Sequence, residues 1–162
     1  MGRAFAPRHP GRESWRHRVR RPEAAVALTS GGLDSCALVA HLAARGREVF
    51  PLYVKAGLIW EKAELHWLRG LLRAFRSPRL KPHSVLDLPV RDVYRRASWS
   101  LSGRGVPSAR TPDAAVYLPG RNVLLLAKAA VFCAERGIGR IALGSLESNP
   151  FPDARREFLR AM

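Results

Sequence analysis

The feature that most constrains this chain is the segment 29–35, which reads Thr-Ser-Gly-Gly-Leu-Asp-Ser. It stands between a short apolar run at 24–28 and a helical pattern at 36–45 that ends at a glycine. A strand that turns tightly into a helix presents the helix's first N–H groups, which have no intrahelical partner, and the positive end of the helix dipole. The segment therefore predicts a binding site for an anion such as a phosphate group.

The side chains of this segment suit the same purpose. Gly31 and Gly32 lack a Cβ, so the backbone there can adopt positive φ and lie close to a ligand. Ser30 and Ser35 add hydroxyl donors, and Asp34 is placed to cap the helix or to help hold a cation. The segment lacks both the lysine of the Walker loop and the glycine spacing of dinucleotide-binding proteins. An ordinary tight turn is the alternative for the two glycines alone.

The chain is strongly basic, with 28 lysines and arginines against 13 acids among 162 residues. Residues 1–21 contain seven arginines and one acid and show no hydrophobic periodicity. We therefore expect 1–22 to be a basic disordered tail and 23–162 to be the folded domain. An RNA-binding arm is the alternative for the tail. The remaining positive charge suits a polyphosphate site as well as it suits solvated surface arginines.

The two cysteines, Cys36 and Cys133, provide neither a disulfide framework nor a metal-binding pair. Both fall in apolar helical patterns, where a buried free thiol is expected. No apolar run approaches the ~20 residues of a membrane span. These features favour a cytoplasmic protein without a membrane partner.

Apolar runs alternate with helical patterns along the chain, which predicts strands alternating with helices. The expected strands cover 24–28, 49–54, 83–88 and 140–144, and the expected helices cover 36–45, 60–75 and about 121 to 137. A last helix is expected to begin at a cap formed by Asp153. This alternation predicts the α/β class, with a Rossmann-like parallel sheet covered by helices on both faces.

Three local features of the sequence lead to separate structural expectations. Pro51 is unfavourable inside a central strand, so it should lie at a strand start or an irregular point. Trp60 and Trp67 are seven residues apart, which favours one helical face packed in the core. Residues 97–116 form a long irregular segment, which favours a lid or substrate loop.

The polar segments that follow the expected strands converge in the predicted fold. Ligands of parallel α/β sheets bind beyond the carboxyl ends of the strands. Residues 29–35, 117–122 and 145–153 all belong to that end of the sheet. The sequence therefore predicts one site built from these three segments.

The motifs of this chain resemble those of a known family. Ser-Gly-Gly-Leu-Asp-Ser at 30–35 resembles the pyrophosphate loop of the PP-loop ATP pyrophosphatases, which have an adenine nucleotide alpha hydrolase-like fold. Together with Leu-Pro-Gly-Arg-Asn at 118–122, Leu-Gly-Ser at 143–145 and Asn-Pro-Phe-Pro-Asp at 149–153, it resembles the 7-cyano-7-deazaguanine synthases of queuosine biosynthesis. The resemblance runs from about residue 24 to residue 162.

The resemblance implies a role for individual residues. It implies that ATP is bound by the loop and the helix start, Thr29, Ser30, Gly31, Gly32, Leu33, Asp34, Ser35, Cys36, Ala37, Leu38 and Val39. The implied catalytic residues are Asp34 and Arg121, which would act with Mg²⁺ and backbone N–H groups to neutralise departing pyrophosphate. The implied substrate contacts are Asn122, Glu147, Asn149 and Asp153.

The implied chemistry is an ATP-dependent ligation in two stages. The carboxylate of 7-carboxy-7-deazaguanine is activated as an acyl-adenylate, and ammonia displaces AMP to give an amide. A further ATP-dependent step dehydrates the amide to the nitrile. The site must also exclude water from the adenylate.

The chain departs from the family pattern in one respect. The family carries a C-terminal segment with a four-cysteine zinc site, and this chain has neither that segment nor enough cysteines to bind zinc in that manner. We therefore expect a shortened family member with no metal site of its own. Weak or absent activity follows unless another chain supplies the rest.

Two other functions stay open on the sequence alone. One is another PP-loop enzyme that adenylates tRNA or a small carboxylate, although the lack of a catalytic cysteine pair argues against thiolation. The other is an inactive fragment that binds a nucleotide or RNA. The expected partners are a small-molecule deazapurine and ammonia; nucleic acid is not expected, and a homodimer is left open.

Overall fold

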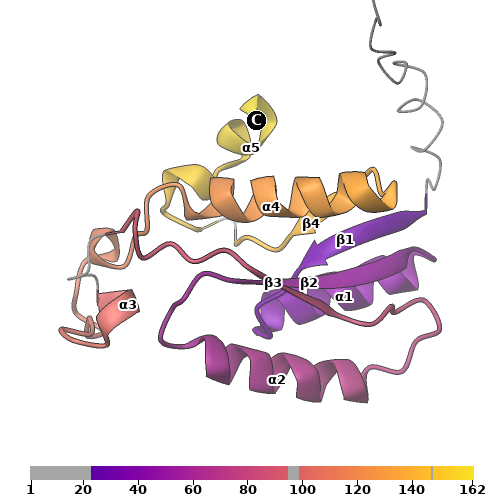
Figure 1. Ribbon diagram of the computed structural model, residues 1–162, viewed down its shortest axis with the longest axis horizontal. Coiled ribbons are helices and arrows are strands. Elements are labelled where there is room, and N and C mark those ends of the chain that lie inside the picture. The colour runs from indigo at the N-terminus through magenta and orange to yellow at the C-terminus, as the bar shows by residue number, and fades with distance from the viewer. Residues whose placement is uncertain (1–22, 95–98, 147) are drawn as a thin grey trace, which may run out of the picture.

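The computed structural model of the protein describes residues 23–94, 99–146 and 148–162 (Figure 1). The predicted tail at 1–22 lies outside the described residues, and so do 95–98 and Glu147. The elements in chain order are β1 (Ala24–Leu28), α1 (Leu33–Ala44), β2 (Glu48–Lys55), α2 (Glu61–Ala74), β3 (Ser84–Asp87), α3 (Trp99–Ser102), the 3₁₀ turn η1 (Asp113–Ala115), α4 (Arg121–Arg136), β4 (Ile141–Leu143), the 3₁₀ turn η2 (Pro152–Ala154) and α5 (Arg156–Ala161).

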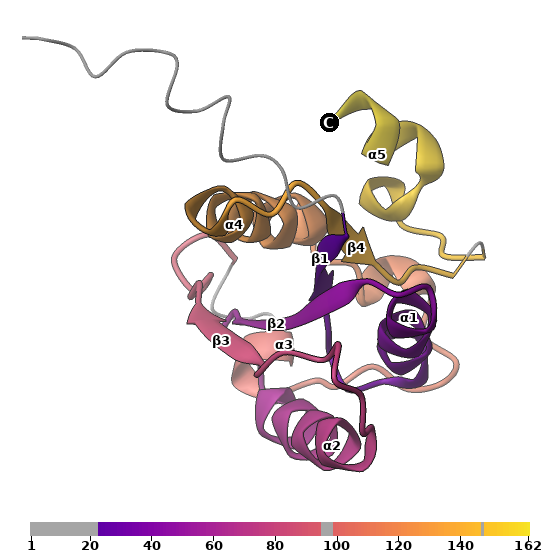
Figure 2. The same cartoon turned by 90° about the vertical axis from the view of Figure 1, so that its right-hand side faces the viewer.

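The four strands form one parallel sheet in the order β3-β2-β1-β4. β1 pairs with β2 on one side and with β4 on the other, and Val26 is opposite both Phe50 and Ile141. Helices α1 and α2 cover one face of the sheet, and α4 covers the other (Figures 1 and 2). The predicted α/β, Rossmann-like fold is confirmed.

Alternate residues of β1 build the two layers of the core. Val26 and Leu28 belong to a buried cluster with Phe132 of α4. Ala25 and Ala27 point the other way and pack with Val39 of α1. Because every residue of β1 is buried, the central strand is apolar throughout, as a strand covered on both faces must be.

Pro51 lies inside β2, where the ladder to the neighbouring strand is irregular. Val49 is paired with Leu80, and Leu52 is paired with Ser84, so one extra residue is accommodated on the β3 side between these pairs. A proline has no N–H to donate, and a break in the ladder removes the need for one. The sequence-based expectation of an irregular point is confirmed, although the strand continues through it.

The expectation that both tryptophans pack in the core is wrong for Trp67, whose side chain is 66% exposed. Trp60 is half-buried and its ring centroid lies 5.2 Å from that of Trp99. The spacing argument required both residues to be helical, and Trp60 precedes the first helical residue, Glu61. The core of α2 is supplied instead by Leu68, which is fully buried.

The segment after β3 is more ordered than its composition indicates. Ser100 and Leu101 of α3 are buried, and the carbonyl of Ser100 accepts the Ile59 N–H at 2.9 Å. The Trp99 indole N–H donates to the carbonyl of Ala115 at 3.1 Å. α3 is therefore packed against the loop that follows β2, whereas most residues from 102 to 115 are exposed.

Candidate functional site

A cleft of about 230 Å³ opens at the carboxyl ends of β1, β2 and β4. Its lining comes from each of the three segments that the sequence placed there: Ser30 and Asp34 from the first, Asn122 from the second, and Asn149 from the third. The structure thus brings these segments to one location, beyond the strand ends where parallel α/β sheets hold their ligands.

Only part of the loop implied to bind ATP faces this cleft. Thr29, Ser30, Gly32, Asp34 and Ser35 line it. The remaining six, Gly31, Leu33, Cys36, Ala37, Leu38 and Val39, are not among its lining residues. Leu33 is 89% exposed and Val39 is buried in the core on the α1 side of the sheet.

Ser35 ties the loop together from inside. Its Oγ accepts the N–H groups of Gly31 at 3.2 Å and Ser30 at 3.4 Å, and it donates to the carbonyl of Gly32 at 2.9 Å. The Thr29 hydroxyl likewise donates to the carbonyl of Leu52 on β2. Both side chains therefore hold the loop in shape, and an incoming anion would compete with the Ser35 hydroxyl for two backbone donors.

The two glycines of the loop have different functions. Gly31 has a φ of +84°, and a Cβ there would lie 2.8 Å from the Glu64 carbonyl oxygen and from the Leu68 nitrogen. Its missing side chain lets α2 pack directly on the loop. Gly32 has a φ of −77° and is open toward the cleft. The sequence assigned both glycines to the ligand, and the structure shows that Gly31 is required by the packing of α2.

Arg121 is a cleft residue with an unsatisfied hydrogen-bond donor. It begins α4, lines the cleft, and its Nε is buried without any hydrogen-bond partner among the described residues. A buried guanidinium donor is costly when unsatisfied, since the desolvation penalty of a charged group is about 1–3 kcal/mol or more. An anionic ligand in the cleft would supply the missing acceptor.

Asp153 forms a cap, but not of the helix that the sequence indicated. Its Oδ2 accepts the backbone N–H of Asn122 at 3.0 Å, and its carbonyl accepts the Asn122 Nδ2 at 3.3 Å. It thereby caps α4, where the N-cap residue Gly120 provides no side-chain bond. The last helix, α5, follows Arg155 without a side-chain cap. The expectation that Asp153 caps the last helix is therefore wrong.

The other residues implied to contact substrate differ in their placement. Asn149 lines the cleft while its Oδ1 accepts the N–H of Phe151 at 3.0 Å, and the Phe151 ring stacks on Tyr117 at 5.0 Å. Glu147 lies outside the described residues. A Cβ on Gly144 would be 3.4 Å from the Asp34 carbonyl, so the end of β4 packs closely on the first turn of α1.

The sequence analysis did not single out Tyr53, which was treated only as a strand residue. Tyr53 lines the cleft, and its hydroxyl donates to Glu64 Oε2 at 2.6 Å. Burial raises the pKa of Glu64, although the Tyr53 hydrogen bond and the nearby Arg121 lower it. Burial and the Glu64 carboxylate raise the pKa of Tyr53. A polar residue at the carboxyl end of a buried strand was the signal that could have found it.

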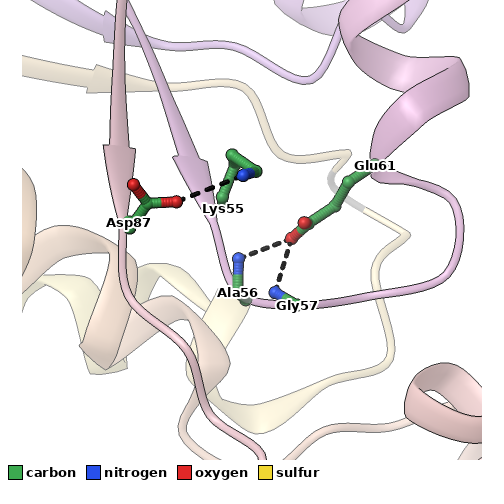
Figure 3. A network of polar contacts seen from close by, with 5 residues as sticks. All are labelled: Lys55, Ala56, Gly57, Glu61 and Asp87. Atoms are coloured by element: carbon green, nitrogen blue, oxygen red, sulfur yellow. Dashed lines mark hydrogen bonds and ion pairs between the residues drawn. The ribbon is translucent and has the colours of Figure 1, made fainter.

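Glu61 organises the loop that connects β2 to α2. Its Oε1 accepts the N–H groups of Ala56 and Gly57, the latter at 2.9 Å (Figure 3). The side chain is buried, whereas the neighbouring ion pair of Lys55 with Asp87 at 3.2 Å is exposed. The hydrogen bonds of Glu61 are therefore with the loop that precedes its own helix.

The described residues contain no group of three or more histidine, cysteine or acidic side chains that could hold a metal ion. Asp34 is the only carboxylate among the described lining of the cleft. Magnesium in nucleotide sites uses one or two carboxylates together with phosphate oxygens. Among the described lining residues, Asp34 is the one whose carboxylate could contact a magnesium ion bound to a polyphosphate. No helix in the described ranges is long and apolar enough to cross a bilayer.

The fold and the cleft define an α/β protein of the Rossmann-like class with a polar cleft at the strand ends. A solved structure shares this fold: the predicted subunit of tRNA methyltransferase from Methanocaldococcus jannaschii, with a TM-score of 0.51 and 16% identity, over 85% of this chain and 60% of that one. At that identity the likeness concerns the fold alone. Residues 24–162 match the model of the family described as queuosine biosynthesis protein QueC. The chain belongs to that family.

Two curated relatives with the same enzyme name are similar to this chain. The 7-cyano-7-deazaguanine synthase 1 of Desulfitobacterium hafniense is 30% identical over 85% of this chain and 61% of its own length. The 7-cyano-7-deazaguanine synthase of Acidobacterium capsulatum is 32% identical over 86% of this chain and 63% of its own length. The chain thus spans about three fifths of these relatives. The resemblance found in the sequence motifs is confirmed.

Proposed function

We propose that the protein is an ATP-dependent ligase of queuosine biosynthesis that converts 7-carboxy-7-deazaguanine and ammonia to 7-cyano-7-deazaguanine. The observation that carries this proposal is the family match over 24–162, with relatives that are named for that product. The cleft at the strand ends supports it, because it combines backbone donors with a buried arginine that has an unsatisfied Nε.

In the first stage, a carboxylate oxygen of the substrate attacks the α-phosphorus of ATP, and the bond to the β-phosphate oxygen breaks. Pyrophosphate leaves with the negative charge, and Arg121 with the first N–H groups of α1 would neutralise it. Ammonia then adds to the acyl carbon of the adenylate. AMP departs with the bonding electrons, a proton is lost from nitrogen, and the amide remains.

In the second stage, the amide oxygen attacks the α-phosphorus of a second ATP, which again releases pyrophosphate. Loss of AMP and of the remaining N–H protons gives the nitrile. Mg²⁺ bound to the polyphosphate would offset its charge, with Asp34 as the protein contact. Asp34 and Arg121 line the same cleft from α1 and α4, so both could contact one polyphosphate.

A second cleft of about 830 Å³ adjoins the first and shares Leu143, Ser145 and Asn149 with it. Arg155 and Arg156 belong to its lining. We propose that this cleft accommodates the deazapurine, because a guanidinium group matches the geometry of a carboxylate. Asn149 would then stand between nucleotide and substrate, while Asp153 keeps its cap on α4.

The test is product analysis by mass spectrometry after incubation of the 162-residue chain with ATP, magnesium, 7-carboxy-7-deazaguanine and ammonium. Although the sequence alone leads us to expect weak or absent activity from this shortened chain, the proposal predicts the amide and then the nitrile, each dependent on ATP. Arg121→Gln should reduce both products at least tenfold. Arg45→Gln makes the same change on an exposed residue at the other end of α1 and should leave them unaltered. Folded protein that binds ATP without forming either product would refute the ligase assignment.

A further inference from the structure

The outer side of α2 and the segment after it carry an unusual excess of positive charge. Between Lys62 and His83 there are six lysines and arginines and a single acid, Glu64. That acid points inward, because its carboxylate accepts the Tyr53 hydroxyl. The helix lies at the outer edge of the molecule in both views (Figures 1 and 2). This surface therefore presents cations with no acidic neighbour of its own segment.

The basic side chains of α2 share one face of the helix. Lys62, His66, Arg69 and Arg73 follow one another at intervals of four, three and four residues, and all four are exposed. None of the three lysine and arginine side chains forms an ion pair with another described residue. Arg69 and Arg73 also line a cleft at the end of the helix.

That cleft, of about 540 Å³, lies between the end of α2 and the segment that enters β3. Arg69, Arg73 and Arg76 belong to its lining together with apolar side chains such as Phe75 and Leu80. Lys81 also lines it, but its Nζ is engaged by Glu48 at 2.7 Å. Because α2 runs back along the sheet, this cleft is at the opposite end of the sheet from the Arg121 cleft.

Trp67 adds an exposed aromatic surface to the outer side of α2, on a different flank of the helix from Arg69 and Arg73. Its indole is 66% exposed, and its ring contacts the His66 ring edge to face at a centroid distance of 5.3 Å. Two of its four adjacent helical positions hold small residues, Ala63 four positions before and Gly70 three positions after, and the other two hold Glu64 and Leu71. An exposed tryptophan on a helix that also carries a row of basic side chains matches the platforms on which unpaired bases stack, with the strand crossing the outer face of the helix.

The charge of this surface indicates which kind of partner it could bind. A second copy of this chain would bring a like-charged surface against this one, which is unfavourable for a protein with a net charge of +15. A polyanion is complementary. We propose that the outer face of α2 and its adjoining cleft bind single-stranded nucleic acid, with phosphates on Arg69, Arg73 and Arg76 and a base stacked on Trp67. This departs from the expectation that nucleic acid is no partner, and it is independent of the proposed ligase activity.

The test is fluorescence anisotropy of short uridine-rich RNA, and of DNA of matching sequence, titrated with the full chain at several salt concentrations. One variant combines R69A, R73A and R76A, and a second is W67A. Two controls remove the same charge elsewhere: R45A with R104A and R110A, which are exposed and outside α2, and R16A with R18A and R20A in the N-terminal segment. Thermal melting of each variant establishes that it is folded.

The proposal predicts that the α2 triple variant binds at least tenfold more weakly. The slope of log K against log salt concentration should be shallower by about 2, since each lost phosphate contact to a single strand reduces this slope by about 0.7. W67A should weaken binding about fivefold or more with an unchanged salt slope, because stacking is not screened by salt. Binding of either oligonucleotide with this pattern supports the site, and the stronger of the two identifies the natural strand. Loss of equal size in all three charge variants, loss only in the N-terminal variant, or no binding by the wild type would overturn it.

Discussion

The cap that Asp153 places on α4 provides a quantitative test of the structure. Replacing it by alanine removes the acceptor of the Asn122 N–H, which is 3.0 Å from Oδ2. Asp153 is only 4% exposed, so water cannot readily replace the lost carboxylate. Gly120, the residue before α4, has no side chain with which to compensate. The helix start would be left with an unpaired donor close to the cleft.

The expected loss follows from two overlapping quantities. A side-chain N-cap contributes about 0.5–2 kcal/mol, and a hydrogen bond to a charged group contributes about 1.5–3 kcal/mol. Both describe the same interaction, so we expect the free energy of unfolding to fall by about 2 kcal/mol for Asp153→Ala. For a domain of this size, each kcal/mol lowers Tm by about 2–4 °C. Asp153→Ala should therefore melt about 4–8 °C below the wild type.

The assay is thermal unfolding followed by circular dichroism. Asp153→Asn keeps an acceptor oxygen but loses the charge, so it should show about half of this decrease. Glu157→Ala removes an exposed acid four residues further along and should shift Tm much less. An Asp153→Ala protein that melts within about 1 °C of the wild type would refute the reasoning, because it would mean that the α4 N-terminus does not depend on this carboxylate.

Two further predictions concern the packing of α2. Gly31→Ala should lower the free energy of unfolding by about 2 kcal/mol or more, since its Cβ would meet two backbone atoms at 2.8 Å and its φ is +84°. Gly32→Ala is the control, because Gly32 has a negative φ and a Cβ there would meet only the Ser30 Oγ, at 3.5 Å. Equal Tm values for the two variants would contradict this account. The pKa of Glu64 is raised by burial, so the wild type loses stability as pH rises through the titration of this carboxyl, whereas Glu64→Gln does not. The Tm of Glu64→Gln relative to the wild type should therefore rise between pH 4 and pH 7, and a constant or falling difference would be the adverse result.

Much of the fold could be predicted because its signals are local. The strand 24–28 and the end of α4 at Gly137 follow from apolar runs and from a glycine with positive φ. The convergence of 29–35, 117–122 and 145–153 follows from parallel topology, which places the carboxyl ends of all strands at one edge. The sequence motifs also led to the family that the comparisons show.

The missed features all depend on contacts between distant segments. Gly31 is constrained by α2, Asn122 by Asp153, and Tyr53 by Glu64. Helical periodicity also could not place Trp67, because it gives the spacing of a face but not which face the sheet covers. No single-segment pattern contains this information.

The central claim is that the cleft around Arg121 binds the phosphates of ATP, and isothermal titration calorimetry with ATP and magnesium measures this directly. The account predicts saturable binding by the wild type and affinity at least about tenfold weaker for Arg121→Gln, since a hydrogen bond to a charged group is worth about 1.5–3 kcal/mol. Arg45→Gln should bind as the wild type does. Equal affinity in the wild type and Arg121→Gln, or no binding by folded wild-type protein, would contradict the account.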